Sequence, residues 1–280
     1  MSINLTSRIT DEERMLLRRA EELYSRAEAG APALSPFLNP RERYILEHML
    51  PRLFAGDESE PLCFFWGGFD GAERTLLCCL PAYYRYSLEE GAPPHTAAKE
   101  ELSAAIVTLR VKASGYVKLS HRDFLGASVG LGIDRSALGD ILIDETGAVL
   151  FCAPGVAQLL KNELVYIGRD KVKTVDHTLP ADFTYTRAFE TIRGTVASER
   201  LDAVLSEVAR TSRETAKELI RQGLVEHNHF EASEPDAAVS DGDIISCRKT
   251  PGCKGGKFII DSLSERSAKG RIRLEARRYL

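Results

Sequence analysis

Long apolar runs are what this sequence lacks most clearly. No stretch approaches the roughly 20 consecutive apolar residues that a membrane-spanning helix needs. Residues 1–30 also lack the short apolar core that marks a secretory signal. We therefore expect a cytoplasmic protein without a membrane partner.

Cysteine pairs of the zinc-binding kind are also missing. The chain has six cysteines, and none of them stands in a C-x-x-C pair. Cys78 and Cys79 are adjacent, so they cannot easily serve one tetrahedral site together. We expect reduced, mostly buried thiols, and neither a metal nor a cofactor.

Glycine loops with the spacing of a nucleotide site are a third absence. GLGIDR at 130–135 and WGGFDG at 66–71 are rich in glycine, but neither matches a phosphate loop or a dinucleotide fingerprint. Turns between helices and strands explain both stretches better than a nucleotide site does.

Charge of both signs is present, but it is unevenly distributed. The formal net charge is -4, which by itself argues against a general nucleic-acid binder. From Arg187 to Leu280 there are 17 Lys and Arg against 15 Asp and Glu, whereas residues 1–186 have 20 against 26. From Ser246 onward, 10 basic residues stand against 3 acidic ones. This asymmetry points to a local anionic partner of the C-terminal part.

The first third of the chain has helix signals followed by strand signals. Residues 10–29 form helix-type sequence that ends at the turn-formers of 30–37. A second helix begins after Asn39 as N-cap, with Pro40 in its first turn. Residues 60–84 then contain two apolar strands around a glycine-rich connection.

The middle of the chain has the order β-α-β-β-α-β. The expected elements are a strand at 102–111, a helix at 120–133 opened by a Ser120–Asp123 capping box, a hairpin at 140–153, a helix at 154–164 and a strand at 170–177. This is the order of a ferredoxin-like domain, which RNA-recognition modules also use. The polar segment 178–191 is a candidate connection.

Residues 211–228, TSRETAKELIRQGLVEHN, carry a helix with a basic stripe. Ser212 is placed to cap it and Gly223 to end it. Three cations follow each other at i, i+4 and i+8, namely Arg213, Lys217 and Arg221. Such a stripe suits RNA phosphates. The alternative is a solvated helix with i,i+3 ion pairs from Glu214 and Glu218.

The opposite side of that helix is apolar. Ala216, Leu219 and Ile220 can pack on the preceding helix, which spans roughly 200–210. The basic stripe is then left toward solvent. Short strands are expected after it, at LVEH, DIISCR, KFIID and RIRLEAR.

The C-terminal part resembles the S-four RNA-binding domain, a module named for a ribosomal protein and shared by tyrosyl-tRNA synthetases and many pseudouridine synthases. The resemblance rests on RLD at 200–202, SR at 212–213, LIRQGLV at 219–225, Asn228 and DGDII at 241–245. In that family the second helix and the following turn bind structured RNA. Carried over by position, the RNA-binding residues are Arg200, Ser212, Arg213, Lys217, Arg221 and Asn228. We add His227, beside Asn228, as an RNA-binding candidate.

Two features depart from that family. It usually has V-N-G after the second helix, where this chain has His229 in place of the glycine. His227 and His229 lack further ligands nearby, so an RNA-facing or solvated pair is expected instead of a metal site.

The second departure is a longer loop, RKTPGCKGGKF, where a short Arg-Gly-x-Gly-Arg stretch is usual. Its glycines keep it flexible in our interpretation. Four cations keep its charge, and we expect them to contact RNA: Arg248, Lys249, Lys254 and Lys257.

Most of the chain is similar to the YlmH-type proteins, bacterial S-four proteins often encoded beside division genes. The similarity rests on FLNPRERYIL, WGGFDGAERTLLCCLP, VKLSHRDFLGASVGLGIDRSALGDIL and LVYIGRDKV. It implies an RNA-recognition-like middle domain before the S-four domain. It also implies likeness to quality-control factors that bind large ribosomal subunits carrying an obstructing peptidyl-tRNA.

A catalytic role has weaker support. In SHRD at 120–123 the capping box already explains Ser120 and Asp123, which leaves His121 and Arg122. With Arg135 they are candidates for secondary contacts to RNA or within the fold. The pseudouridine-synthase alternative needs a catalytic Asp in an R-L-D stretch of a much larger domain, whereas the RLD here lies in the S-four region. Asp202 is therefore expected to cap or brace a helix.

These observations predict an α+β protein with a helical N-terminal segment (1–58), a ferredoxin-like middle domain (59–180), a linker (181–198) and an S-four domain (199–280). The expected function is non-catalytic binding of structured RNA, with rRNA and tRNA as the candidate RNAs, on the large ribosomal subunit in the rescue of stalled translation. We expect a monomer in isolation. The alternatives are an RNA-modifying enzyme and a cell-division adaptor.

Overall fold

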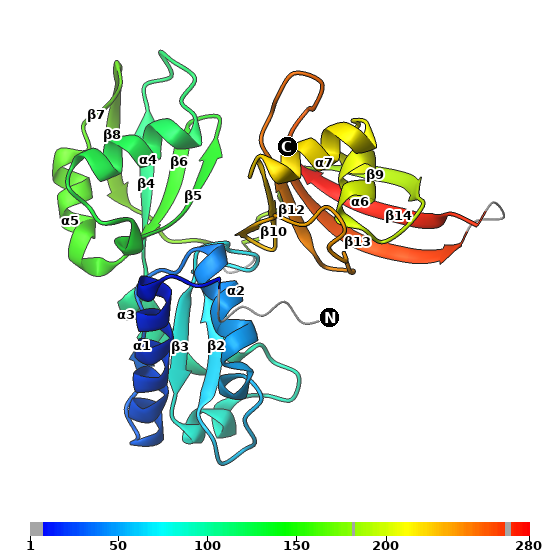
Figure 1. The fold of residues 1–280 in the computed structure, drawn as a ribbon. Coiled ribbons are helices and arrows are strands. Elements are labelled where there is room, and N and C mark those ends of the chain that lie inside the picture. Colours follow the sequence, from blue (N-terminus) through cyan, green and yellow to red (C-terminus); the bar gives the residue numbers. More distant parts are fainter. Residues whose placement is uncertain (1–7, 181–182, 267–269) are drawn as a thin grey trace. The chain divides into compact units, whose positions relative to one another are not determined.

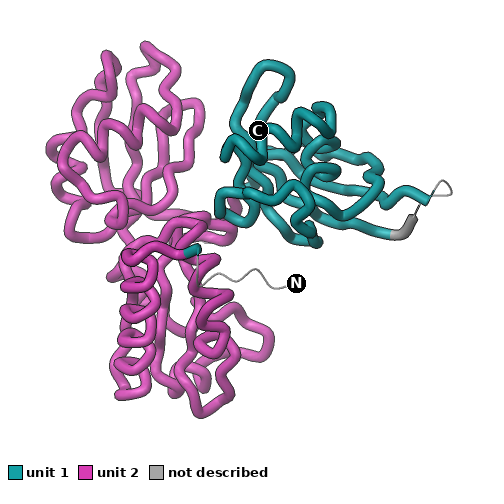
Figure 2. Tube along the Cα trace, viewed as in Figure 1, with its two compact units in different colours: residues 1–8, 186–280 teal, residues 9–185 magenta. Residues whose placement is uncertain are grey.

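A computed structural model describes residues 8–180, 183–266 and 270–280. The predicted N-terminal segment, linker and S-four domain include residues 1–7, 181–182 and 267–269, which lie outside the described residues. The described chain is mixed α/β and has two compact units. Residues 9–185 form one, and residues 186–280 with Arg8 form the other (Figure 2).

Seven α-helices and fourteen strands make up the described chain (Figure 1). The helices are α1 (Asp11–Glu28), α2 (Pro40–Met49), α3 (Lys99–Ala105), α4 (His121–Gly130), α5 (Pro154–Glu163), α6 (Leu201–Val208) and α7 (Arg213–Arg221). The strands of the first unit are β1 (Ala33–Leu34), β2 (Leu62–Trp66), β3 (Leu76–Leu80), β4 (Val107–Ala113), β5 (Leu138–Asp144), β6 (Gly147–Cys152), β7 (Tyr166–Ile167) and β8 (Asp170–Asp176). Those of the second unit are β9 (Phe189–Val196), β10 (Val225–His227), β11 (Phe230–Glu231), β12 (Ile244–Cys247), β13 (Gly256–Arg266) and β14 (Ile272–Tyr279).

Capping residues explain where the first two helices begin. Thr10 Oγ1 accepts from the backbone N–H of Glu13 at 3.2 Å, and the Glu13 carboxylate accepts from Thr10 N at 2.8 Å. Asn39 and Glu42 form the same reciprocal box before α2, with Pro40 in the first turn. The Asn39 cap predicted from the sequence is thus confirmed.

The N-terminal part of the first unit packs α1 and α2 on a small antiparallel sheet with the order β1-β3-β2. Every residue of β3 is buried. All six cysteines of the chain are buried, as predicted. Within the described residues no group of three or more His, Cys, Asp or Glu is arranged to hold a metal ion.

The second sheet of this unit has the antiparallel order β5-β6-β4-β8-β7. Helices α4 and α5 cover one of its faces, where Phe124 and Leu160 pack with Leu109, Val111 and Leu150 (Figure 1). The hairpin and both helices expected here are confirmed. The capping box is also present, since the Asp123 carboxylate accepts from Ser120 N and Ser120 Oγ, both at 2.7 Å.

One boundary was predicted wrongly. Residues 99–105 form helix α3, so the strand expected from residue 102 begins only at Val107. The physical reason is composition, because Leu102, Ala104 and Ala105 favour a helix and the β-branched residues start at Ile106.

The second unit packs α6 and α7 on a six-stranded antiparallel sheet with the order β11-β10-β12-β13-β14-β9. Both helices and the four strands predicted here are present. Residues 189–196, predicted as part of the polar connection and linker, instead form β9. This strand pairs with β14 along its whole length, from Phe189 opposite Tyr279 to Val196 opposite Ile272. A partner some 80 residues away leaves little local signal. Nowhere in the described chain is a helix both long and apolar enough to span a membrane.

Candidate nucleic-acid interface

Helix α7 is positioned by its cap and by its apolar face. Ser212 Oγ accepts from the backbone N–H of Thr215 at 3.0 Å, which starts the helix as predicted. Ala216, Leu219 and Ile220 are buried in the core shared with α6. The charged side of α7 therefore faces away from this core.

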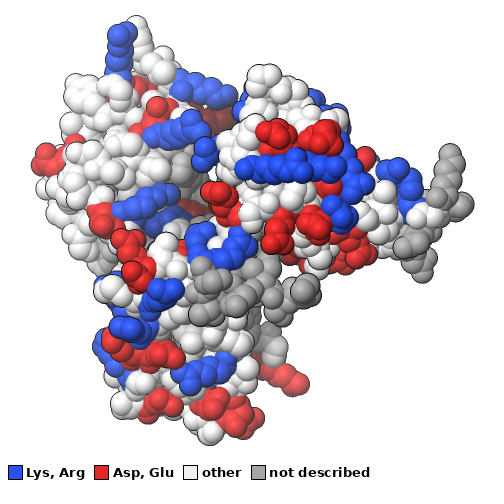
Figure 3. All heavy atoms as spheres, viewed as in Figure 1, with Lys and Arg blue, Asp and Glu red and all other residues white. Residues whose placement is uncertain are grey.

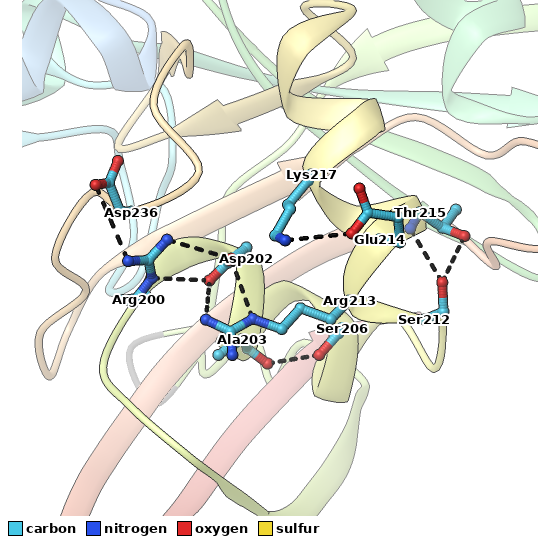
Figure 4. A network of polar contacts seen from close by, with 10 residues as sticks. All are labelled: Arg200, Asp202, Ala203, Ser206, Ser212, Arg213, Glu214, Thr215, Lys217 and Asp236. Carbon is cyan, nitrogen blue, oxygen red and sulfur yellow. Dashed lines mark hydrogen bonds and ion pairs between the residues drawn. The ribbon is translucent and has the colours of Figure 1, made fainter.

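Two arginines of the predicted interface converge on one buried carboxylate (Figure 4). Asp202, in the first turn of α6, is 0% exposed. Arg213 donates to it from Nε and Nη2, both at 3.1 Å. Arg200 donates from Nε at 3.3 Å and from Nη2 at 3.5 Å. Asp202 thus braces the start of α6 against the start of α7.

The charge of Asp202 is stabilised by its partners. Burial alone would raise the pKa of this carboxyl, but hydrogen bonds and charge from Arg213 and Arg200 outweigh burial and lower the pKa. The carboxylate therefore stays ionised at neutral pH and holds both guanidinium groups in place.

The stripe predicted along α7 is only partly open. The Arg213 side chain is 44% exposed, so it has a solvent edge beside its ion pair. Lys217 Nζ lies 3.2 Å from Glu214, which is one of the two i,i+3 pairs of the solvated-helix alternative. Glu218 bonds Gln222 instead of Arg221. Arg221 is exposed, and its side chain has no polar partner among the described residues.

The turn after α7 is tight although it contains no glycine. His227 pairs with Phe230 across the hairpin, so Asn228 and His229 are its two central residues. Both are left-handed, with φ of 50° at Asn228 and 68° at His229. Positive φ at both positions is the type I′ geometry, in which Asn-Gly is favoured. His229 therefore takes the conformation for which the S-four family usually has glycine.

Asp243, just before β12, holds this turn. Its carboxylate accepts from Asn228 Nδ2 at 2.7 Å and from Ser240 N at 2.9 Å, and it hydrogen-bonds His227 Nε2 at 2.7 Å. Asn228 Oδ1 accepts from Ile244 N at 2.9 Å. Burial opposes ionisation of Asp243, yet the bonds from His227 and Asn228 lower its pKa.

Two of the predicted RNA-binding side chains thus point into the interior of the fold. His227 and Asn228 are both buried, with Asp243 as their shared partner. The DGDII stretch therefore holds the turn at Asn228, through the hydrogen bonds of Asp243 and Ile244 with Asn228. His229 is half-buried.

The basic loop between β12 and β13 has a defined backbone. Thr250 and Cys253 exchange backbone hydrogen bonds at 3.2 and 3.0 Å. Pro251, followed by Gly252 with φ of 80°, gives a type II turn between them. A Cβ on Gly255 would lie 2.5 Å from Lys249 N, so the loop folds closely on itself there. The glycines of this loop thus allow a particular backbone conformation. The sequence had instead led us to expect that they keep the loop flexible.

The base of this loop lies beside the segment that follows α7. Arg248 N donates to Leu224 O at 3.0 Å, which places the base of the loop against the segment that follows the helix. Lys257 Nζ lies 4.6 Å from the centroid of the Tyr279 ring. The other three loop cations are exposed, and with Arg221 they form what we name the basic end: Arg221, Arg248, Lys249 and Lys254.

Sequence reasoning missed two neighbours of Lys254. Arg210 and Arg278 line a small hollow with it, and both pair with Glu190, at 3.6 and 3.3 Å. Arg210 is exposed, directly after α6. A cation just past a helix C-terminus is a recognisable signal. Arg278 offered none, because only the pairing of β14 with β9 brings it there.

The three secondary candidates separate into two groups. His121 and Arg122 are exposed in the first turn of α4. Arg135 is half-buried, and burial lowers its pKa. Its backbone carbonyl accepts from Nη2 of the buried Arg74 at 2.8 Å, so Arg135 belongs to the packing of the first unit.

On the face drawn in Figure 3, basic and acidic side chains are interleaved over both units. A broad positive field is absent from that face. An anionic partner would therefore meet local groups of cations such as the basic end.

Three similarities to known proteins bear on the family of this chain. Residues 98–180 match a family model described as "Putative RNA-binding domain in YlmH". The ribosome-associated protein quality control protein P2 of Bacillus subtilis (strain 168) is 30% identical over 221 residues, which is 77% of each chain. The solved structure of the cell division protein ylmH from Streptococcus pneumoniae is 25% identical, with a TM-score of 0.44 over 61% of this chain and 93% of that one. The identity and coverage of the Bacillus relative show that this chain belongs to the YlmH family.

Proposed function

We propose that this protein binds structured RNA on the large ribosomal subunit carrying peptidyl-tRNA, in the quality control of stalled translation, and that it catalyses no reaction. The name of the Bacillus relative and the RNA-binding description of the matching family support the general part. The large subunit and the peptidyl-tRNA are carried over from the family resemblance.

We also propose that the sheet order β5-β6-β4-β8, with helices after β4 and β6, represents a ferredoxin-like domain within residues 59–180. Residues 199–280 would be the S-four domain, after a linker that begins at residue 181. The pairing of β9 with β14 supports counting β9 with this C-terminal domain.

The observation that carries the function is the basic end. Its four cations are exposed, and their side chains have no polar partner in the part of the chain that the structure describes. Most exposed cations elsewhere in this unit, such as Arg193 with Glu275 at 3.0 Å, have an acidic neighbour. Unpaired Lys and Arg on an ordered loop suit RNA phosphates without base specificity.

Arg200 and Arg213 have a different role in this proposal. Asp202 holds both in fixed orientations while leaving a solvent edge on each. They are placed to add phosphate contacts at low entropic cost. His227 and Asn228 support the turn after α7, since Asp243 holds their side chains inside the fold.

The buried state of Asp202 also weighs against the pseudouridine-synthase alternative. A catalytic carboxylate must reach its substrate. Asp202 is 0% exposed, and both its oxygens accept from arginines. The R-L-D stretch is therefore explained by the brace between α6 and α7.

Sedimentation with ribosomes and separated subunits tests the proposal. The informative variant is Arg221→Ala/Lys249→Ala, because neither side chain has a partner whose loss would disturb the fold. The matched control is Arg14→Ala/Arg52→Ala, which removes two exposed cations from the first unit. Binding is measured at several salt concentrations.

We expect the wild type and the control to sediment with large subunits, and the Arg221/Lys249 variant to be lost at moderate salt. On isolated RNA its salt slope should fall by about two units, one per cation. An unchanged slope would remove the basic end from the interface. No ribosome association at any salt would redirect the proposal to free RNA or to a protein partner.

A further inference from the structure

The two faces of the sheet β5-β6-β4-β8-β7 differ sharply in cover. Side chains alternate between faces along each strand. Leu109 and Val111 of β4 lie on the face that α4 and α5 cover. The alternate residues Thr108, Arg110 and Lys112 therefore lie on the helix-free face.

On the helix-free face, other parts of the same unit cover the side chains of β6. Val149 and Phe151 of β6 are both buried in a second core cluster. Phe69 packs on Phe151 with ring centroids 5.0 Å apart, and a Cβ on Gly68 would come within 2.7 Å of that ring. RNA-recognition sheets stack bases on aromatic side chains of their open face. Here the aromatic residue of β6 is covered and unavailable for stacking.

The end of this face formed by β4, β8 and β7 is exposed to solvent and basic. Lys112 of β4 pairs in register with Lys173 of β8, so the two lysines are direct cross-strand neighbours. Lys171 follows on the same face of β8, opposite Tyr166 of β7. All three lysines are exposed, and Tyr166 is 58% exposed. We name Lys112, Lys171 and Lys173 the lysine patch.

The neighbouring charges do not neutralise the lysine patch. Arg110 bonds Asp144 at 2.7 Å and also contacts Thr146, so that acid is already engaged. Asp176 binds Lys161 at 3.0 Å. Glu145 is exposed at the tip of the β5–β6 hairpin. In the described chain no ion pair or hydrogen bond reaches the three lysine side chains.

Directly opposed like charges destabilise an antiparallel pair. The Lys112–Lys173 pair therefore has a cost within the isolated protein that an anionic ligand would relieve. Evenly spaced lysines without hydrogen-bond partners suit a phosphate backbone better than a base edge.

We propose that the lysine patch is a second RNA contact, in which the middle sheet binds the sugar-phosphate backbone and does not stack bases on its central strands. This inference rests on the proposed function, because it assumes an RNA partner. It assigns the middle sheet a sequence-independent role, with Tyr166 at the rim of the patch. The basic end and the lysine patch would then act as two separate phosphate-binding surfaces.

The test uses the full chain and a fluorescent synthetic RNA hairpin, with binding followed by anisotropy over a range of salt. The variants are Lys112→Ala/Lys173→Ala and the charge-preserving Lys112→Arg/Lys173→Arg. Lys161→Ala is the matched control, because that lysine is already paired with Asp176. The Arg221→Ala/Lys249→Ala variant is measured beside them.

We expect the alanine pair to lower the salt slope by about 1.8 units, at about 0.9 per phosphate contact. The loss should be equal for hairpins of different sequence, and the arginine pair should restore the slope. Loss of like-charge repulsion should leave the alanine pair at least as stable to heat as the wild type, which excludes misfolding as the cause.

Three outcomes would overturn the inference. If only the Arg221/Lys249 variant lowers the slope, the proposed function survives and the lysine patch is excluded. If the wild type binds no RNA, both fail together. If polyglutamate competes with RNA equally well at equal charge, the patch binds acidic chains in general and is not an RNA contact.

Discussion

Asp202 and the lysine patch show two opposite uses of basic residues in one chain. The buried carboxylate of Asp202 accepts hydrogen bonds from Arg200 and Arg213 at 3.1 to 3.5 Å. At Lys112 and Lys173, two cations face each other across strands without an acid between them. The first arrangement stabilises the fold, whereas the second costs stability and leaves charge available. Basic residues of one chain can therefore have opposite effects on its stability.

The largest expected effect comes from removing the two arginines that hold Asp202. Arg200→Ala/Arg213→Ala leaves Asp202 buried without a partner, which should cost about 3 kcal/mol of unfolding free energy. The figure is at the lower end of the usual range because both guanidinium groups are partly exposed. Hydrogen exchange at the amides of α6 measures it for the second unit alone.

The control for this prediction is Arg193→Ala. That side chain is 76% exposed in its pair with Glu275, so its loss should change stability by less than about 0.5 kcal/mol. A double variant as stable as this control would show that Asp202 is not the brace described here.

Low pH should weaken both the contacts of Asp202 with its arginines and the contacts of Asp243 with the turn at Asn228. The folded-state pKa values of Asp202 and Asp243 are lowered, so their stabilisation is complete above the unfolded pKa of about 4 and is lost as the pH falls through the folded values. Residues 186–280 should therefore lose stability below about pH 4. Denaturant unfolding at a series of pH values checks this.

The variant Asp202→Asn separates the two carboxylates in that experiment. It should be less stable at neutral pH and show a shallower decline in acid, because one of the two titrating groups is gone. A decline as steep as in the wild type would assign the acid sensitivity to Asp243 or to other groups.

A smaller effect distinguishes geometry from charge on α7. Arg213→Lys keeps the positive charge but loses the two-pronged contact with Asp202, so stability should fall by about 1 kcal/mol. The salt slope of RNA binding should stay within experimental error of the wild type. A slope reduced by a whole unit would mean that the orientation of the guanidinium group, and not its charge alone, supports the phosphate contact.

The smallest predicted effect concerns the type I′ turn. His229→Gly removes a left-handed non-glycine residue and should raise the unfolding free energy by about 1 kcal/mol or less. Thermal unfolding of the two proteins measures it. A destabilised glycine variant would show that the contacts of the His229 side chain outweigh the backbone strain.

Local signals predicted most helices and strands correctly. Asn39 with Pro40, and Ser120 with Asp123, mark helix starts that the structure confirms. The start of β4 was misplaced because a local signal was misread, since Leu102, Ala104 and Ala105 favour helix α3. The error at β9 arose where distant pairing decides the conformation, because its partner β14 lies at the other end of the unit.

The candidate interface was only half predictable for the same reason. Spacing identified Arg213 and Arg221 together on α7, but it could not show that Asp202 engages one and leaves the other unpaired. Likewise Asn228 stands in the predicted RNA-binding set, while the fold uses its side chain to bind Asp243.

The sequence by itself determined the helix caps, the apolar faces, the turn residues and the excess of positive charge after Ser246. These depend on neighbours within a few residues, so they can be read along the chain. Only the tertiary structure decided which cations are neutralised and which sheet face stays open. Burial and ion pairing depend on residues far apart in sequence, as with Arg213 on Asp202 and Phe69 on Phe151. Those contacts separate the cations that hold the fold from the cations left for a partner.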